Sequence, residues 1–290
     1  FGVFEKFESS FPGQYFNVGV AEQNMTGVAT GLALEGKKVV TYSIGNFATL
    51  RCLEQIRNDA CYHEANITII ANGGGFSYGS LGMSHHTTED LAILRSLPNI
   101  SVVAPCTAQE AGEAITAMIK NGGTGYLRLD KTVAKDCFSE DPFVIGKSRR
   151  YKEGKDITLI ATGSILGDAN IASVELKKLG IDARVVGMHS IKPIDVDEII
   201  DAATNTGGIV TIEEHNKDGG LGSAISEVCM DFGVMPNKFL RIGLDNKYSS
   251  IVGSQSYLRS RYEMDSKAII NKVKKIFNSW KGLLFKRWFS

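Results

Sequence analysis

One glutamate stands in surroundings that suit acid–base chemistry. A short strand is expected to end at Gly19 and a helix is predicted over 22–35, so the Glu22 carboxylate lies near a helix N-terminus, where negative charge is stabilised. Helix capping alone would account for that position. A carboxylate beside a closely packed helix interface is partly desolvated, which raises its pKa and prepares it to share a proton. Small residues that would permit such packing recur at Gly27, Ala29, Gly31, Ala33 and Gly36.

Two adjacent histidines form a second candidate site. His85 and His86 lie in a loop rich in glycine and serine, which is poor for core packing and lets an imidazole reach a polar substrate near neutral pH. Adjacent side chains point in different directions, so one of the two is expected to face the substrate. No metal site is expected here, because further ligands are missing from the neighbourhood.

Arg128 is a third candidate, because it follows a predicted strand at the edge where sites form in parallel sheets. A guanidinium binds phosphate through paired donors, and a salt bridge to Asp130 or Glu140 is the structural alternative. The glycine run 73–75 lacks the context of a dinucleotide-binding or P-loop motif. It therefore predicts a tight turn rather than a phosphate site.

Alternating strands and helices are needed to position these residues. Continuous apolar, β-branched runs predict strands covered on both faces. The pattern predicts a doubly wound parallel sheet over 1–135, a polar linker over 136–154 and a smaller α/β domain over 155–275. Strands are expected over 39–44, 67–71, 100–105, 125–129, 157–164, 183–186 and 208–212. Helices are expected over 22–35, 49–62, 89–97, 108–120, 168–179 and 222–232.

Composition excludes several classes of protein. The 290 residues correspond to about two domains at roughly 150 residues each, and 43% hydrophobic content can fill two cores. Basic and acidic residues number 32 each, so no overall positive field exists for nucleic acid or an anionic membrane. No apolar run reaches the roughly 18 to 20 residues of a membrane helix, and no signal peptide is recognised. Five scattered cysteines fit neither a disulfide framework nor a zinc site, which predicts a cytoplasmic protein with reduced thiols.

The last segment, 276–290, is a basic amphipathic tail. Apolar side chains recur there near helical spacing, with basic residues between them. A helix lying on a membrane surface is one interpretation. A terminal helix docked on its own domain or on a partner chain is the interpretation we favour. The apolar positions are Ile276, Phe277, Trp280, Leu283, Leu284 and Trp288.

Several motifs, in the right order, resemble one enzyme family. They are YFNVGVAEQN (15–24), NFATLR (46–51), EQIR (54–57), GMSHH (82–86), EDLAILRSLPN (89–99), GYLR (125–128), HSIKPID (189–195) and TIEEH (211–215). The motifs of the first half resemble the pyrimidine-binding domain of transketolases and 1-deoxyxylulose-5-phosphate synthases, which are thiamine diphosphate enzymes. The last two resemble the C-terminal domain of that family. The resemblance covers nearly the whole chain except the tail.

This resemblance implies how the cofactor is held. Glu22 matches the family's catalytic glutamate, which binds N1′ of the aminopyrimidine and favours the tautomer that activates the cofactor. An aromatic ring is expected to stack on the aminopyrimidine. Phe47 is the candidate for that ring, with Tyr42 and Tyr78 as alternatives.

The resemblance also implies which residues meet the substrate. His85 matches the substrate-facing histidine of the family and is preferred to His86, while Arg128 matches an arginine that binds the phosphate of the sugar. Met83 and Ser84 stand where the family commonly has Pro-Thr, so the identity of the substrate stays open. An acidic residue that contacts sugar hydroxyls in many transketolases is also replaced in this loop.

The family's diphosphate-binding half is missing from this sequence. Family enzymes hold Mg²⁺ and the diphosphate in a separate domain that begins with Gly-Asp-Gly, and this sequence has no such motif. The chain therefore resembles the C-terminal subunit of a split, two-component transketolase, whose N-terminal subunit would hold most of the Mg²⁺ site. An assembly with two copies of each subunit is implied. Phe1 is expected to lie just after the first strand and helix of the domain, so its N-terminal part is missing here.

Three functions compete. The favoured one is transfer of a two-carbon ketol unit between sugars, either sugar phosphates or modified sugars. The alternative is decarboxylation of a 2-oxoacid, as in deoxyxylulose-phosphate synthases or 2-oxoacid dehydrogenase β subunits. A non-catalytic partner subunit is the third, and the retained Glu22 and His85 argue against it. The second domain supplies no obvious catalytic group, and its TIEEH motif (211–215) is expected in a loop at a subunit contact.

Overall fold

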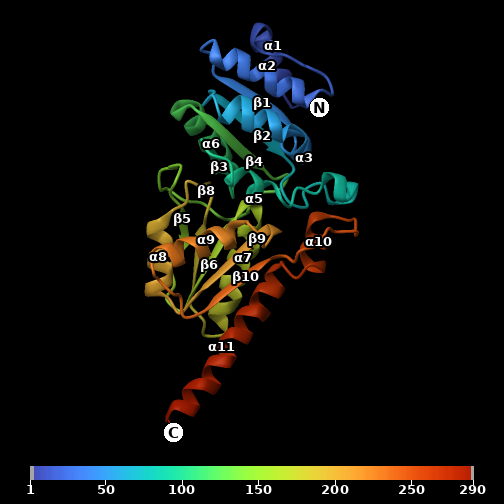
Figure 1. Ribbon diagram of the computed structural model, residues 1–290. Coiled ribbons are helices and arrows are strands. Elements are labelled where there is room, and N and C mark those ends of the chain that lie inside the picture. The colour runs from blue at the N-terminus through green and yellow to red at the C-terminus, as the bar shows by residue number, and fades with distance from the viewer. Residues whose placement is uncertain (1–2, 289–290) are drawn as a thin grey trace.

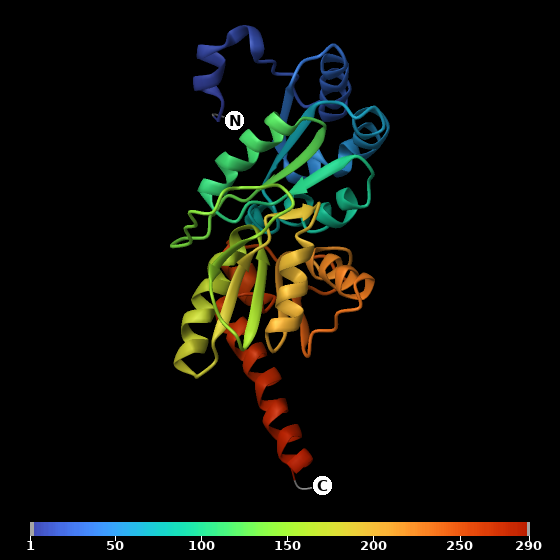
Figure 2. The same ribbon diagram turned by 90° about the vertical axis from the view of Figure 1, so that its left-hand side faces the viewer.

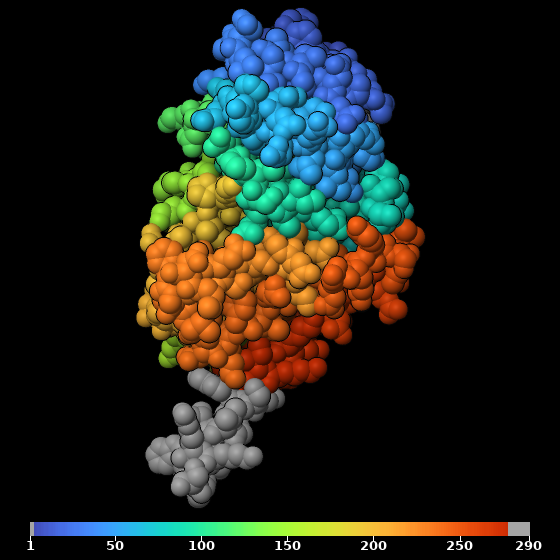
Figure 3. All heavy atoms as spheres, in the orientation of Figure 1, coloured from blue at the N-terminus to red at the C-terminus, as the bar shows by residue number. Residues whose placement is uncertain are grey.

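The computed structural model describes residues 3–288, and it describes side chains for residues 3–277. Two α/β domains follow one another along the chain and stack end to end (Figure 1). In the space-filling view the two domains meet without a gap (Figure 3). Within the described residues, no helix is long and apolar enough to cross a membrane.

The first domain is built on a five-stranded sheet. Its strands are β1 (Val39–Ile44), β2 (Ile67–Asn72), β3 (Ile100–Val103), β4 (Thr124–Leu129) and β8 (Ser190–Lys192). Their order is β1-β2-β4-β3-β8, and the first four run parallel. The edge strand β8 comes from the second half of the sequence and pairs antiparallel with β3.

The second domain contains another five-stranded sheet. Its strands are β5 (Arg149–Lys152), β6 (Ile157–Thr162), β7 (Ala183–Gly187), β9 (Ile209–Asn216) and β10 (Phe239–Leu244). Their order is β10-β9-β6-β7-β5, and only the edge strand β5 is antiparallel to its neighbour. These two sheets confirm the predicted parallel α/β architecture with a second α/β domain.

Helices and helical turns connect the strands. Those of the first domain are α1 (Glu5–Ser10), η1 (Pro12–Gln14), α2 (Glu22–Leu34), α3 (Gly45–Ala48), η2 (Leu50–Cys52), α4 (Leu53–Gln55), η3 (Ile56–Cys61), η4 (Gly79–Leu81), η5 (Met83–His85), α5 (Asp90–Arg95) and α6 (Ala108–Asn121). Those of the second domain are η6 (Gly163–Ile165), α7 (Leu166–Lys178), α8 (Val196–Asn205), α9 (Leu221–Asp231), α10 (Gln255–Arg261) and α11 (Ser266–Trp288). The helix α11 leaves the second domain as one continuous rod (Figure 1).

Helices cover both faces of the first sheet. Ala29 of α2 belongs to the same buried cluster as Ile69 of β2. The next residue of that strand, Ile70, packs with Met118 of α6 in a separate cluster. Successive side chains of a strand point to opposite faces, so α2 and α6 lie on opposite sides of the sheet (Figure 2). Burial on both faces explains why these strands read as unbroken apolar runs.

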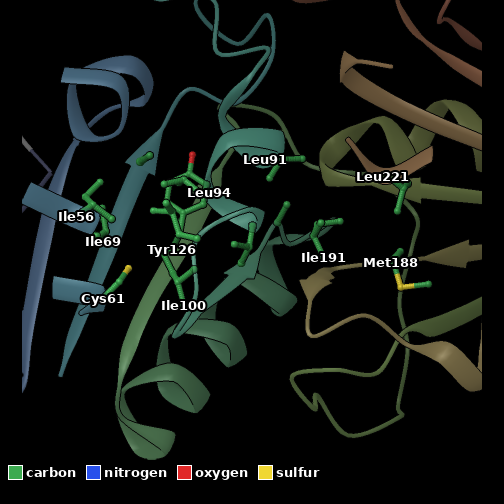
Figure 4. Close-up of a cluster of buried hydrophobic side chains, with 14 of the residues drawn as sticks. Ile56, Cys61, Ile69, Leu91, Leu94, Ile100, Tyr126, Met188, Ile191 and Leu221 are labelled. Carbon is green, nitrogen blue, oxygen red and sulfur yellow. The ribbon is translucent and has the colours of Figure 1, made fainter. Parts of the chain in front are cut away.

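The larger hydrophobic core crosses from one domain into the other. Figure 4 shows this cluster running from Ile56 and Ile69 through Leu94 to Met188 and Leu221. All five side chains are at most 2% exposed. Because one core serves both domains, and β8 extends the first sheet, the two halves hold each other in a fixed relative position.

Two predicted elements of the first half are wrong. No strand forms before Gly19: the segment is extended but unpaired, and Phe16 is 68% and Val20 92% exposed. An isolated segment has no neighbouring strand to satisfy its backbone, so periodicity alone cannot make it a strand. The single helix expected over 49–62 is instead a succession of a 3-10 turn (η2), one short α-helical segment (α4) and a π-helical turn (η3).

The second half contains elements that the sequence did not indicate. The expected linker holds β5, which charge had concealed: Arg149 is 1% exposed and its guanidinium lies 2.7 Å from Glu113. The strands β8 and β10 and the helix α8 were also not predicted. In the tail, Ile276 and Phe277 pack against the core of the second domain. The side chains of Trp280, Leu283, Leu284 and Trp288 lie outside the described residues.

Candidate active site

Glu22 lies at the start of α2, beside the end of β1. Its side chain is 9% exposed, and one carboxylate oxygen, Oε2, accepts a hydrogen bond from Nη1 of Arg51 at 2.7 Å. The other oxygen, Oε1, is 3.4 Å from the hydroxyl of Ser43. One carboxylate oxygen is thus firmly paired, and the other retains acceptor capacity.

The pKa of Glu22 differs in direction from the expectation. Burial raises it, but the hydrogen bond and positive charge of Arg51 outweigh burial, so the pKa is lowered below its ordinary value. The expected raised pKa is therefore wrong for this arrangement of the chain. The Arg51 side chain is 42% exposed, so water already competes for the guanidinium.

Aromatic rings surround this carboxylate. The guanidinium carbon of Arg51 lies 4.4 Å from the ring centre of Phe47 in α3, a cation–π distance. The His85 ring meets Phe47 edge to face, with ring centres 5.2 Å apart, and Tyr78 lies on the other side of His85 at 6.4 Å. The structure thus brings Glu22, Phe47 and His85 to one place, with Arg51 as the link.

Two asparagines tie this region together, and the sequence had not singled them out. The amide nitrogen of Asn72, the last residue of β2, donates to the hydroxyls of Tyr42 at 3.0 Å and Tyr78 at 3.1 Å. Asn46 donates to the carbonyl oxygens of Ser84 and His86 across the loop. Both follow buried strands, where a polar residue at the carboxyl end is a signal for a site in a parallel sheet. Burial raises the pKa of the Tyr78 phenol, so its hydroxyl stays protonated.

The two histidines occupy different environments. His85 is half-buried, and its Nδ1 lies 3.0 Å from the Ser84 hydroxyl. His86 is 3% exposed, and its Nε2 lies 3.2 Å from the carbonyl oxygen of Gly79. Burial lowers the pKa of His86, which keeps its ring neutral. Of the two, His85 has the ring that meets Phe47 and remains partly accessible.

Arg128 lies in the junction between the two domains, away from Glu22. Its side chain is 2% exposed, and its Nε is 3.2 Å from Oδ2 of Asp90. Its Nη2 donates at 2.9 Å to the carbonyl oxygens of Thr87 and Glu214. The alternative partners expected for a salt bridge, Asp130 and Glu140, are replaced by Asp90. A guanidinium enclosed in this way has no free face for a sugar phosphate, and its geometry favours a structural role.

The TIEEH motif also lies in this junction. Glu213, Glu214 and His215 belong to the strand β9 rather than a loop, and all three are at most 3% exposed. The Glu213 carboxylate accepts hydrogen bonds from the backbone nitrogens of Leu221 and Gly222 at the start of α9. The motif therefore makes an interdomain contact within one chain, and the expected loop is wrong.

Glu213 provides a test through the pH dependence of stability. Burial raises its pKa to about 7, although the two backbone donors act in the opposite direction. The folded chain then holds the proton more tightly than the unfolded chain, so the free energy of unfolding declines as pH rises from about 4.5 to about 7 and levels off above. The displacement corresponds to at most about 3 kcal/mol. Denaturant unfolding at pH 5 and pH 8 should show a smaller decline for Glu213→Gln than for the wild type, and equal declines would contradict the assignment.

Metal-binding side chains do not gather at this site. Among the residues whose placement is described, no group of three or more histidines, cysteines, aspartates or glutamates is arranged to hold a metal ion. The five cysteines are free, and four of them are buried. What the site offers is one carboxylate, several aromatic rings and one imidazole.

Comparison with known proteins places this arrangement in a family. The family model described as the transketolase pyrimidine-binding domain matches residues 1–135, and the model of the transketolase C-terminal domain matches residues 146–269. One of the two subunits of an apulose-4-phosphate transketolase from Phocaeicola vulgatus is 35% identical and covers 91% of this chain, which spans 84% of that protein. A 1-deoxy-D-xylulose-5-phosphate synthase of Geobacter metallireducens is 33% identical over 92% of this chain, which spans only 43% of that enzyme.

A solved structure agrees with the sequence relatives. The structure described as "Split gene transketolase, inactive beta4 tetramer" is 36% identical, with a TM-score of 0.83 over 93% of this chain and 85% of that chain. Sequence and fold therefore lead to the same relatives, in which the two domains found here occur together. This chain belongs to the transketolase family, whose members are thiamine diphosphate-dependent transferases, and it contains the pyrimidine-binding and C-terminal domains of that family.

Proposed function

We propose that this chain is one subunit of a split transketolase and supplies the pyrimidine-binding half of the active site. The observation that carries the proposal is the Glu22 carboxylate, which begins a helix and faces Phe47 and the loop of His85. A scaffold that only stabilised a partner would not need an acidic side chain held among aromatic rings beside an imidazole.

The residues present fit the aminopyrimidine end of thiamine diphosphate. Oε1 of Glu22 has only a long contact with Ser43, at 3.4 Å, and can accept a hydrogen bond from a protonated ring nitrogen. Phe47 offers an aromatic face nearby, with Tyr42 and Tyr78 as alternatives. No described cluster fits Mg²⁺ or the diphosphate, so we assign both to a separate subunit.

The proposed mechanism follows from these positions. When bound, thiamine diphosphate supplies a nucleophilic carbon that adds to a carbonyl and an electron sink while the adjacent carbon–carbon bond breaks. Glu22 holds the proton shared with N1′ of the aminopyrimidine. Arg51 can release the carboxylate toward solvent, because its side chain is already 42% exposed. His85 hydrogen-bonds the hydroxyl or carbonyl oxygen of the sugar, while Asn46 fixes the backbone of its loop.

The exposed face of α2 supports assembly through this helix. The buried side of α2 includes Thr26 and Ala29, while Gly27, Val28 and Gly31 lie on the exposed side. A methyl group added at Gly27 or Gly31 would meet no atom of the described chain within 4 Å. A second copy of this helix can therefore approach closely. We propose an assembly with two copies of each subunit, in which two α2 helices pack against each other.

The substrates we propose are a ketose donor and an aldose acceptor, as sugar phosphates or modified sugars. The test is a comparison of donors with the chain and its partner subunit mixed. Turnover of hydroxypyruvate or a ketose phosphate, with an aldose acceptor, supports ketol transfer. Turnover of pyruvate instead would support the 2-oxoacid alternative, and no turnover of any donor would support a non-catalytic subunit. The cytoplasmic location expected from the cysteines stays a prediction.

His85 gives a second test of the same site. His85→Ala should lower kcat/KM for the ketose donor about 10- to 100-fold, because one hydrogen bond to the reacting sugar is lost. The dissociation constant of thiamine diphosphate should change less than about twofold. His63→Ala is the matched control, since His63 is exposed and hydrogen-bonds only locally to Asp59. Equal kinetics for the two variants would remove His85 from the site.

A further inference from the structure

The loop that carries His85 is closed on itself at its base. It leaves the end of β2 and returns at Thr87, where Gly75 and Thr87 exchange two backbone hydrogen bonds of 2.8 and 2.9 Å. Between these points the loop extends away from the first sheet and lies next to α10 of the second domain (Figures 1 and 3). The position of His85 therefore depends on what holds this loop from outside.

Glu214 of the second domain holds the base of the loop. Its carboxylate accepts a hydrogen bond from the backbone nitrogen of Phe76, another from Nε of Arg259 at 2.6 Å, and a third from Gln255 at 3.0 Å. The approach is so close that a methyl group added at Gly75 would lie 2.7 Å from Oε1 of Glu214. Gly75 also has a φ of +57°, so glycine is required here on two grounds.

Two further contacts attach the middle of the loop to the second domain. The Phe76 ring is fully buried between the His86 ring, at 5.1 Å, and the ring of Tyr262, on which it stacks at 5.5 Å. The backbone nitrogen of Gly253 donates to the carbonyl oxygen of Gly79 at 3.2 Å. Gly79 is also the partner of the His86 imidazole, so this contact fixes the turn just before the two histidines.

Arg259 completes this arrangement by neutralising Glu214. It is 8% exposed, and its remaining donors are used by the Ser164 hydroxyl at 2.6 Å and the Asp168 carboxylate at 3.1 Å. A buried carboxylate that loses its cation is strongly destabilised and must rearrange or take up a proton. The hydrogen bond to Phe76 would be lost or weakened in either case.

We propose that the Glu214–Arg259 pair is a positioning device for the His85 loop, through which the C-terminal domain controls the geometry of substrate binding. The pair touches neither substrate nor cofactor. It acts through the backbone of Phe76, and small displacements of a substrate-binding group are costly in rate. The kinetic part of this proposal rests on the proposed role of His85, whereas the structural part does not.

Hydrogen exchange of the full chain mixed with its partner subunit tests the structural part. Arg259→Met should make the backbone amides of 73–87 exchange at least about 10-fold faster, and Arg259→Lys should restore much of the protection. Arg184→Met is the matched control, because Arg184 is also a buried arginine of the second domain, paired with Asp201 and Glu198 far from the loop. Unchanged exchange of 73–87 in Arg259→Met, or an equal increase in Arg184→Met, would overturn the proposal.

Kinetics of the same variants test the consequence for substrate binding. Arg259→Met should raise KM for the ketose donor about 10-fold, with less than a twofold change in the dissociation constant of thiamine diphosphate. A loosened loop with unchanged KM and kcat would overturn the positioning role. If Arg259→Met does not fold, Gln255→Ala replaces it, since Gln255 donates to both Glu214 and Ser77, and should act in the same direction more weakly. If the wild-type mixture shows no ketol transfer, the proposed function fails, and hydrogen exchange alone still decides whether the pair holds the loop.

Discussion

Glu22→Gln is expected to lower ketol transfer by the reconstituted enzyme at least about 100-fold. Glutamine keeps the shape of the side chain but cannot hold the proton shared with N1′ of the aminopyrimidine, and a positioned acid–base group contributes about 100- to 10,000-fold to rate. Folding should change little, because the ion pair lost is with an arginine that is 42% exposed, and such pairs contribute about 1 kcal/mol or less. Steady-state turnover of hydroxypyruvate with an aldose acceptor is the measurement.

A control on the same helix makes this result specific. Glu35 caps the C-terminal end of α2 and is exposed, so Glu35→Gln changes the same side chain with no contact to the site. Its turnover should equal that of the wild type. If Glu22→Gln retains more than about a tenth of wild-type turnover, Glu22 is not the group that activates the cofactor.

Gly31→Leu is expected to weaken self-association at least about 100-fold while leaving the single chain as stable as before. Gly31 is exposed in the middle of α2, and a methyl group there meets no atom within 4 Å. Leucine is a better helix former than glycine by roughly 1 kcal/mol, so the isolated chain should gain stability if it changes at all. A bulky side chain would separate two packed helices, however, and Glu22 begins the same helix. Light scattering across a concentration series, alongside turnover, measures the effect.

Gly112→Leu is the matched control for this experiment. Gly112 is an exposed glycine of α6, also without any atom within 4 Å of an added methyl group. This substitution should leave both the mass in solution and turnover unchanged. Unaltered assembly of Gly31→Leu at micromolar concentration would show that the exposed face of α2 is not the contact between copies.

The fold was predictable where burial and period agreed. Strands β1, β2, β6 and β7 have buried apolar residues on both faces, and their sequences read as continuous runs. The strand β5 was missed because its Arg149 is buried by pairing with acidic side chains, which composition cannot reveal. The edge strand β8 was missed because its pairing depends on β3, from a distant part of the sequence. Short elements that depend on tertiary contacts leave a weak local pattern.

The site was predictable in its residue types but not in its electrostatics. Glu22, Phe47 and His85 do lie together, although nothing in the sequence indicated that Arg51 would pair with the glutamate and lower its pKa. Arg128 illustrates the opposite limit, because a cation at the end of a strand suits phosphate binding and a buried domain contact equally well. Its burial beside Asp90 becomes visible only once β9 of the second domain is in place.

Binding of thiamine diphosphate tests the central claim most directly. Calorimetric titration with the cofactor and Mg²⁺ should be carried out on this chain alone, on the partner subunit alone and on the mixture. The account predicts saturable binding in the mixture and none in either subunit alone, because the carboxylate and aromatic rings lie in one subunit and the groups for Mg²⁺ and diphosphate in the other. Full-affinity binding by this chain alone, or no binding by the mixture, would contradict it.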